Sequence, residues 1–343
     1  MSKKERKLCL FQLPLLDLFC VTRNLENMAV YTHLNHDQIK GYLAEYNLGT
    51  LASFEGIEQG VSNTNYKLYT EQGHFILTLF EPHRVDEKTI PFFLSYAGML
   101  AEAKIPSARP ISRNDGSLFG SLAKRPAVIM SYCEGEHLSE VKADHCFAVG
   151  KLLANMHLAS DAFELTQKNQ YSKTKWKQWI SELDEGLNDI SFGLHAALVS
   201  ELDYLQRNWP SELPIGSIHA DLFPDNVFFI DDEVTGLIDF HFACNDFLAY
   251  DLAIVICAWC FDNQNQFSQQ RYESLLSGYN EVRPLNELEV EALPTLLRGA
   301  AFRFVLSRAE EVLAHKPGDL NTPHDPVIFI NRLELLQHEL VNH

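Results

Sequence analysis

The chain has 343 residues, of which 46% are hydrophobic and 11% aromatic, and its formal charge at neutral pH is −18. A chain of this length and composition can bury a large core, which excludes collagenous, low-complexity and disordered proteins. The acidic balance disfavours nucleic acid and anionic membrane surfaces as partners, although Mg²⁺ and backbone N–H groups can still supply local positive potential for a small phosphate ligand.

The seven cysteines are scattered among apolar runs, which is typical of reduced, buried thiols and predicts a cytoplasmic location. Cys257 and Cys260 form a Cys-x-x-Cys pair without a second pair, so we interpret them as core thiols rather than a redox or zinc site. No charge-free apolar run reaches about 18 residues, and we therefore expect no transmembrane segment.

The chain begins with a basic stretch followed by an apolar one, an order similar to that of a signal peptide. Pro14 and Asp17 interrupt the apolar stretch, and no small-residue cleavage site follows it. We therefore interpret residues 1–27 as a poorly ordered extension.

The pattern in the first half of the chain predicts a small antiparallel sheet with helices. Residues 36–46 repeat apolar side chains at helical spacing, and Asn35 precedes them as a candidate N-cap. A second helix is expected at residues 86–104, interrupted early by Pro91. Strands are expected at residues 53–59, 65–70, 74–80 and 127–130, with hairpin turns at 71–73 and 114–116.

The second half of the chain is predicted to be mostly helical. Helices are expected at residues 146–158, 175–187, 196–208, 271–279 and 288–314. One strand-like island, residues 216–240, lies among them. A sheet followed by helices predicts an α+β chain of two lobes, with a small ligand in the cleft between them.

The strand-like island carries the most informative polar residues. His219, Asp221 and Asn226 follow one short apolar run, and Asp239 lies at the end of the next. Phosphoryl transfer to a hydroxyl needs a carboxylate that orients the hydroxyl and takes its proton, and oxygen ligands that hold Mg²⁺ against the phosphates. A loop and the strand beyond it can bring Asp221, Asn226 and Asp239 to one side of a cleft. The alternative, that they are ordinary turn residues, explains each residue but not the full spacing.

At these residues the chain resembles the aminoglycoside phosphotransferase and choline kinase family, which is related to the protein kinases, and within it the homoserine kinases of that fold. The resemblance covers nearly everything from about residue 29 onward. It rests on residues 28–32, 60–66, 75–81, 91–94, 219–230 and 238–240. It implies a protein-kinase-like fold, with an N-terminal nucleotide-binding lobe at residues 28–132 and a C-terminal catalytic and acceptor-binding lobe at residues 133–343.

The resemblance also implies a role for each residue of the motif. Asp221 is similar in position to the catalytic aspartate that orients the acceptor hydroxyl, and His219 to the residue that braces its loop. Asn226 and Asp239 are similar in position to the two ligands of Mg²⁺. The binding of ATP is implied for residues of the phosphate loop, the third strand and the connector between the lobes: Gly60, Ser62, Asn63, Asn65, Thr78, Met130 and Tyr132.

One position departs from the general pattern of these kinases. Most of them carry a lysine in the third strand, paired with a helix glutamate. Thr78 stands at that site here, and the homoserine kinases that the chain resembles share this feature. Lys67 on the neighbouring strand is a candidate substitute, but a solvent-exposed strand lysine is the simpler interpretation.

Homoserine is a zwitterion, so its site needs a cationic and an anionic partner. Residues 298–308 contain three arginines, and we rank Arg303 first for the carboxylate because its neighbours are apolar, with a surface ion pair as the alternative. Asp246 is the candidate for the ammonium group. Asp251 is interpreted instead as the N-cap of a helix.

The resemblance implies ATP-dependent phosphorylation of L-homoserine with Mg²⁺, and we expect no nucleic-acid or membrane partner. Relatives with the same motif act on other small hydroxylated amines, so an aminoglycoside, choline or hydroxylysine is the alternative acceptor. A catalytically silent nucleotide-binding regulator is a third hypothesis, motivated by the missing lysine. The sequence is compatible with a monomer or a homodimer.

Overall fold

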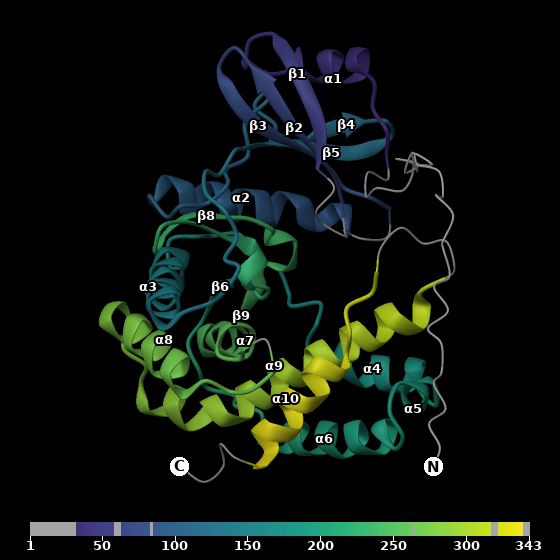
Figure 1. Ribbon diagram of the computed structural model, residues 1–343, viewed down its shortest axis with the longest axis vertical. Helices are drawn as coiled ribbons and strands as arrows, with labels where there is room; N and C mark the ends of the chain where they lie inside the picture. The colour runs from purple at the N-terminus through teal and green to yellow at the C-terminus, as the bar shows by residue number, and fades with distance from the viewer. Residues whose placement is uncertain (1–31, 58–62, 83–84, 263, 317–321, 339–343) are drawn as a thin grey trace, which may run out of the picture.

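The computed structural model describes residues 32–57, 63–82, 85–262, 264–316 and 322–338. The predicted extension at residues 1–27 and the predicted site residues Gly60 and Ser62 lie outside this part of the chain. The described part consists of a small sheet and, beneath it, a larger region made mainly of helices (Figure 1).

The N-terminal sheet contains five antiparallel strands in the order β1-β2-β3-β5-β4. Their bounds are β1 Leu51–Ile57, β2 Thr64–Thr70, β3 Gly73–Leu79, β4 Gly120–Leu122 and β5 Arg125–Ser131. The predicted strands are confirmed, and β4 is an additional short strand at the edge. The turn between β2 and β3 requires Gly73, whose φ is +124°.

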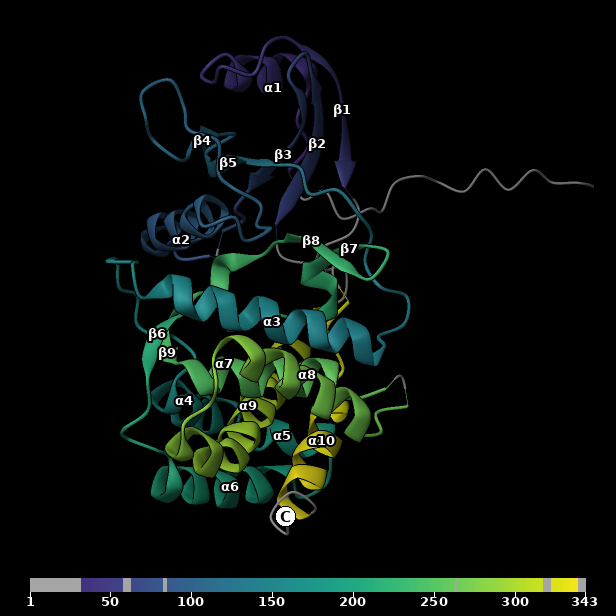
Figure 2. The ribbon, with the colours of Figure 1, turned by 90° about the vertical axis from the view of Figure 1, so that its left-hand side faces the viewer.

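Two helices cover opposite faces of this sheet (Figure 2). α1, His36–Leu43, begins after Asn35, whose side chain accepts a backbone N–H of the first turn in a capping box, as expected. α1 packs on the strand side chains that alternate to one face, Leu77 and Leu79 among them. α2, Ile90–Glu102, packs on the other face.

Two local predictions in this half are wrong. Pro91 does not interrupt the helix expected over residues 86–104, because α2 begins at Ile90 and Pro91 occupies its first turn, where the missing N–H costs nothing. A separate 3₁₀ turn, Glu87–Thr89, precedes it. Residues 114–116 form a turn, but within the described residues no strand flanks it directly, so it is not a hairpin turn.

The second region contains eight helices and two short antiparallel strand pairs within the described residues. The helices are α3 Ala143–Ser160, α4 Lys173–Leu183, α5 Gly186–Ile190, α6 Leu194–Asn208, α7 Leu248–Trp259, α8 Gln269–Val282, α9 Glu287–Ala314 and α10 Val327–His338. The strand pairs are β6 Ile215–Ile218 with β9 Cys244–Phe247, and β7 Val227–Ile230 with β8 Glu233–Leu237. The expected α+β order, a sheet followed by helices, is confirmed.

Sequence patterns missed α10 and β9, and the helix expected to begin at Asp251 is α7, which begins earlier, at Leu248. Every residue of α7 is buried, so its sequence has no polar face that would reveal a helical period. The single helix expected over residues 175–187 is instead α4 followed by α5. α4 ends because Asp184 adopts a φ of +36°, which is incompatible with continuing the helix.

One hydrophobic core extends from α2 into the helices of the second region. Tyr96 of α2 belongs to the same cluster of buried side chains as Trp259 of α7 and Phe302 of α9. The Tyr96 hydroxyl also donates to the backbone oxygen of Ser217 in β6 at 2.8 Å. α2 is therefore fixed to the helical region, and the division of the chain at residues 132 and 133 stays a prediction.

The apolar side chains of the helices are buried in this core. None of the helices that the structure describes is both long enough and apolar enough to span a bilayer. Cys257 and Cys260 of the core are buried free thiols, and the Cys257 thiol donates to the backbone oxygen of Leu297 at 3.6 Å. Burial raises the pKa of the Cys257 thiol to about 12, which makes it a poor nucleophile or metal ligand.

Candidate active site

The predicted catalytic residues lie in the loop that joins β6 to β7. His219 comes directly after β6, and a 3₁₀ turn at Pro224–Asn226 leads into β7. Ala220 has a φ of +62°, a left-handed conformation that costs free energy for any residue other than glycine. Contacts from outside the loop must therefore stabilise it.

Asp251 in the first turn of α7 provides the strongest of these contacts. Its buried carboxylate accepts the backbone N–H groups of His219 at 2.9 Å and of Ala220 at 2.8 Å, and His157 of α3 lies at 3.2 Å. Burial opposes the charge, but His157 and the loop N–H groups hold the pKa of Asp251 below its ordinary value. The N-cap interpretation of Asp251 is wrong, because Phe247 occupies the cap position.

His219 and Arg303 hold the loop from two further sides. His219 Nδ1 accepts the Asp221 N–H at 3.2 Å, and its Nε2 lies 3.1 Å from the carbonyl oxygen of Ile238. Because Nδ1 accepts an N–H and Nε2 faces a carbonyl oxygen, the geometry places the ring proton on Nε2, and burial lowers the pKa of His219. Arg303 of α9 donates to the carbonyl oxygen of Ala220. The bracing role of His219 stays a prediction, for which these contacts give a physical basis.

The Asp221 side chain is mostly buried and faces Arg303. Its Oδ1 lies 4.0 Å from an Arg303 guanidinium nitrogen. Burial raises the pKa of Asp221 to about 6; Arg303 opposes the rise and the charge of Asp239 adds to it. A carboxylate with a pKa near neutrality is suited to accept a proton from a hydroxyl and release it afterwards.

The β7–β8 hairpin brings Asn226 and Asp239 to the same end of the site. In its antiparallel register, Asn226 and Ile238 face each other just beyond the last strand pair, and the Ile238 N–H donates to the Asn226 carbonyl at 3.1 Å. Asn226 Nδ2 donates to the Asp221 carbonyl at 2.8 Å, which leaves the amide oxygen for another partner. The structure thus brings together Asp221, Asn226 and Asp239, whose roles stay predictions.

Asp239 and Asn226 form a donor set that fits a divalent cation. Asp239 has a φ of +67° and forms an ion pair with the ring of His241. Burial opposes its charge, but His241 outweighs this and lowers the pKa of Asp239. An ionised carboxylate and an amide oxygen are the hard ligands that Mg²⁺ prefers.

The predicted nucleotide residues of β2 and β3 lie on the face of the sheet opposite α1. Asn65 pairs with Thr78 across the strands, and the Thr78 hydroxyl donates to Asn65 Oδ1 at 2.7 Å. Asn63 Oδ1 accepts the N–H of Glu81 at 3.3 Å. This face therefore offers amide and hydroxyl groups at the position of the usual lysine, and their role toward ATP stays a prediction.

Lys67 lies on the same face of the sheet as Asn65 and extends toward the connector. Its Nζ lies 4.2 Å from the centre of the Tyr132 ring, a cation–π contact. Met130 in β5 shares this face through the strand register.

Most kinases of this pattern pair the strand lysine with a helix glutamate. Here Glu102 of α2 and Glu87, in the turn before it, are both exposed. The described part of α2 and the turn before it therefore contain no buried glutamate that could pair with a lysine.

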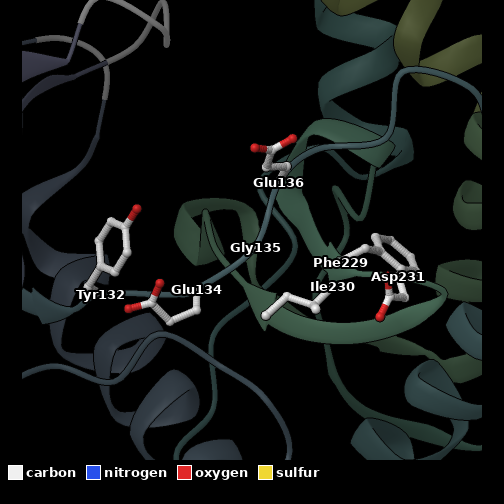
Figure 3. Close-up of a pocket in the computed structure, with 7 residues that line it drawn as sticks. All are labelled: Tyr132, Glu134, Gly135, Glu136, Phe229, Ile230 and Asp231. Carbon is white, nitrogen blue, oxygen red and sulfur yellow. The ribbon is translucent and has the colours of Figure 1, made fainter.

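The connector between the two regions crosses the β7–β8 hairpin. Glu136 exchanges two backbone hydrogen bonds with Phe229, at 3.0 and 2.9 Å. Gly135 has a φ of +114°, and a Cβ there would lie 2.6 Å from the Phe229 oxygen, so only glycine fits. A pocket of about 480 Å³ beside this crossing (Figure 3) is lined by Tyr132, Glu134, Gly135, Glu136, Phe229, Ile230 and Asp231.

Both residues expected to bind the acceptor are engaged within the protein. Arg303 is only 2% exposed and is bonded to the catalytic loop. Asp246 in β9 accepts Asn169 Nδ2 at 2.7 Å on one oxygen and the Phe247 N–H at 2.8 Å on the other. Burial raises the pKa of Asp246. An acceptor role for either residue stays a prediction and would require these contacts to change.

Sequence reasoning missed the anchoring role of Glu81 in the N-terminal region. This nearly buried carboxylate follows β3 and accepts hydrogen bonds from the hydroxyls of Thr64 at 2.6 Å and Thr32 at 2.7 Å, and from Arg125 at 3.1 Å. It joins β2, β5 and the segment before α1. The available signal was an acidic residue placed directly after an apolar strand, which is rare without a partner.

The chain is similar in sequence to known phosphotransferases. The model of the phosphotransferase enzyme family matches residues 53–285. The homoserine kinase of Agrobacterium fabrum is 45% identical over 306 residues, which cover 89% of this chain and 95% of that protein. The homoserine kinase of Parvibaculum lavamentivorans is 44% identical, with the same coverage of 89% and 95%.

Solved structures share the fold at much lower identity. An amicoumacin kinase in complex with AMP-PNP, Ca²⁺ and Ami has a TM-score of 0.69 at 14% identity, covering 89% of this chain and 93% of that one. A microcompartment-associated aminopropanol kinase has a TM-score of 0.67 at 16% identity, covering 90% and 98%. The protein-kinase-like fold is thereby confirmed. On the family match and the two homoserine kinases, the chain belongs to the homoserine kinases of the phosphotransferase enzyme family.

Proposed function

We propose that the protein transfers the γ-phosphoryl group of ATP to the hydroxyl of L-homoserine, giving O-phospho-L-homoserine and ADP. The observation that carries this proposal is the meeting of Asp221, Asn226 and Asp239 around one end of the β7–β8 hairpin. The identity of 45% to a homoserine kinase supports the choice of acceptor. A silent regulator would have no need of a carboxylate whose pKa is tuned toward neutrality.

Asp221 would act on the acceptor hydroxyl. The hydroxyl donates a hydrogen bond to the carboxylate, which directs an oxygen lone pair at the γ-phosphorus. As the new P–O bond forms and the bond to the ADP oxygen breaks, the hydroxyl proton passes to Asp221, and it leaves later to solvent. A pKa of about 6 suits both the acceptance and the release.

Asn226 and Asp239 would hold Mg²⁺, which supplies positive charge for the phosphate oxygens during transfer. The ion pair with His241 keeps Asp239 ionised for this purpose. The buried setting strengthens these electrostatic interactions relative to water.

The loop contacts would determine where the Asp221 carboxylate points. Asp251 fixes the two N–H groups before it, and Arg303 fixes the carbonyl of Ala220. A group already held in its working geometry does not have to reorganise during the reaction. We expect the Asn65–Thr78 pair to donate or accept hydrogen bonds at the phosphates of ATP from the opposite side.

The test is an assay of ADP release with Mg²⁺ and ATP against L-homoserine, hydroxylysine, choline and an aminoglycoside. We expect the highest kcat/KM with L-homoserine, and phosphorus NMR should show a phosphate monoester as the product. A higher kcat/KM with another member of the panel would replace L-homoserine as the substrate. Binding of ATP without ADP release on any acceptor would support the regulator instead.

The proposed partners are small molecules only. The formal charge of −18 supports the absence of nucleic-acid and anionic membrane partners. The five free thiols of the described residues, four of them buried, support action in the reducing cytoplasm.

A further inference from the structure

The acceptor of the proposed reaction carries a carboxylate that needs a cation close to Asp221. α9 contains three arginines, Arg298, Arg303 and Arg308, and their surroundings differ. The contacts that each one already makes decide which of them is able to bind a further carboxylate.

Arg298 and Arg303 are committed to the fold. Arg298 donates two hydrogen bonds to the Glu201 carboxylate, at 2.8 and 2.6 Å, a bidentate pair that satisfies its charge. Arg303 is buried and donates to the carbonyl of Ala220, so a ligand would have to displace a contact that holds the catalytic loop.

Arg308 lies beside the catalytic loop on a stack of aromatic rings. Its guanidinium carbon lies 4.5 Å from the centre of the Phe329 ring. The Phe329 ring lies 4.9 Å from that of Phe304, which in turn lies 4.9 Å from that of Phe223. Because Phe223 belongs to the same loop as Asp221, this stack fixes the guanidinium on the catalytic side of α9.

Among the described residues, Arg308 has no ion-pair partner of the kind that satisfies Arg298. In the described part of the chain it forms no ion pair with a carboxylate, and its hydrogen bond goes to the backbone oxygen of Asp325 at 3.3 Å. Burial lowers the pKa of Arg308, and the Asp221 carboxylate is the first of the acidic groups that oppose this effect. The half-buried guanidinium is thus a cation within electrostatic reach of the catalytic carboxylate.

We propose that Arg308 binds the carboxylate of the acceptor and so selects an amino-acid alcohol over the corresponding simple amino alcohol. The planar guanidinium stacks on Phe329 and has further N–H groups with which to donate to a carboxylate. This inference rests on the proposed function. It assigns to Arg308 the role that the sequence pattern suggested for Arg303.

The test compares L-homoserine with 3-aminopropan-1-ol, which has hydrogen in place of the carboxylate. Arg308→Met keeps an unbranched stem over Phe329 and removes the charge. We expect it to lower kcat/KM for L-homoserine by about 10- to 100-fold, the range for a lost charged hydrogen bond, and to leave kcat/KM for 3-aminopropan-1-ol unchanged. Arg308→Lys retains the charge but lacks the two parallel N–H donors of the guanidinium. It should therefore lower kcat/KM for L-homoserine by less than Arg308→Met does.

Arg207→Met is the matched control, because Arg207 is exposed on α6 and bonds only to its own helix in the described structure. It should change neither acceptor. A loss of equal size on both acceptors in Arg308→Met would overturn the proposal, since it would assign Arg308 to the loop or to the phosphates.

A second measurement avoids the need for turnover of the poorer acceptor. Calorimetry with a non-hydrolysable ATP analogue should show L-homoserine binding about tenfold or more weakly to Arg308→Met than to the wild type. Equal affinity would overturn the proposal. A wild-type protein that binds ATP but does not phosphorylate L-homoserine would instead contradict the proposed function, and the inference with it.

Discussion

Asp251 is a single buried carboxylate that replaces regular backbone pairing in the catalytic loop. Its two oxygens accept the N–H groups of His219 and Ala220, which have no strand or helix partner. A buried N–H without a partner costs about 1–3 kcal/mol, so this residue stabilises a loop that would otherwise relax away from its left-handed residue. The geometry of Asp221 thus depends on the side chain of Asp251, which lies outside the loop.

Asp221→Asn tests the catalytic base. The amide keeps the shape of the side chain but cannot accept the hydroxyl proton, so kcat should fall about 10²- to 10⁴-fold while ATP binding is retained. ADP release and calorimetric titration with the nucleotide measure the two effects. Asp203→Asn, an exposed change on α6, is the control. Near-normal turnover of Asp221→Asn would remove Asp221 from the mechanism.

The same variant should be more stable than the wild type at alkaline pH. Burial raises the pKa of Asp221 from 3.8 to about 6, so the folded protein binds this proton more tightly than the unfolded chain. The unfolding free energy should therefore fall as the pH rises from about 4 to about 6 and stay lower above. Asp221→Asn loses this fall and should gain about 1–3 kcal/mol at pH 8.

Urea titrations with a chelator present measure this difference at several pH values. The two proteins should converge below about pH 3, where Asp221 is protonated in both the folded and the unfolded state. Parallel stability profiles from pH 4 to pH 8 would show that the Asp221 carboxylate is not destabilised by burial.

Residues close together in the chain could be found from the sequence, and those far apart could not. Asp221, Asn226 and Asp239 lie within one hairpin unit, so their spacing alone indicated a shared site. Asp251 and Arg303 reach the loop from 31 and 83 positions away. No local pattern encodes such contacts, which is why Asp251 was interpreted as a cap and Arg303 as a ligand for the acceptor.

At the scale of elements, α3 and α8 approach each other through two glycines. A Cβ on Gly150 would lie 2.2 Å from the carbonyl oxygen of Leu275, and one on Gly278 would lie 2.1 Å from that of Phe147. Both obstacles are backbone atoms, which cannot move aside as a flexible side chain can. The helices therefore pack at a distance that only glycine allows.

Gly150→Ala should lower the unfolding free energy by about 2–3 kcal/mol, because the helices must separate, and this exceeds the gain in helix propensity. Gly41→Ala is the matched control, since a Cβ on Gly41 in α1 meets nothing within 4 Å. It should stabilise the protein by up to about 1 kcal/mol. Denaturant unfolding of both variants checks the contrast, and equal effects would contradict the close packing.

Elements with two distinct faces were predictable, and elements buried on all sides were not. β2 and β3 alternate between the α1 face and the opposite face, so their period is visible in the sequence. α7 has only buried residues, and nothing in its apolar run distinguishes a helix from a strand. The strand β9 is short and carries polar residues that pair with β6, so it lacks an alternation of its own.

At the scale of the molecule, α2 belongs to the helical core although its neighbours in the chain belong to the sheet. Figure 2 shows it between the sheet above and α3 below. The contact of α2 with β6 includes the hydrogen bond from the Tyr96 hydroxyl to the Ser217 oxygen. The two regions are therefore joined by a packed helix as well as by the connector.

Tyr96→Phe tests this joint. The change removes one hydroxyl and leaves the buried Ser217 oxygen with one partner fewer, which should lower the unfolding free energy by about 1 kcal/mol. Tyr69→Phe is the control, because its hydroxyl bonds to Glu55 at the surface. Chemical denaturation followed by fluorescence and circular dichroism should show one shared transition. Equal unfolding free energies for the two variants would show that the Tyr96 hydrogen bond does not stabilise the protein.

The contact between Arg303 and the Ala220 carbonyl has a consequence for the order in which the protein is made. The two residues are 83 positions apart. The ribosome must therefore synthesise more than half of α9 before Arg303 is available to bind the Ala220 carbonyl. A nascent chain that already contains Asp221 still lacks the cation that faces it. The support for the loop therefore forms late in translation, and a product that stops before α9 carries Asp221 in a loop that lacks its Arg303 contact.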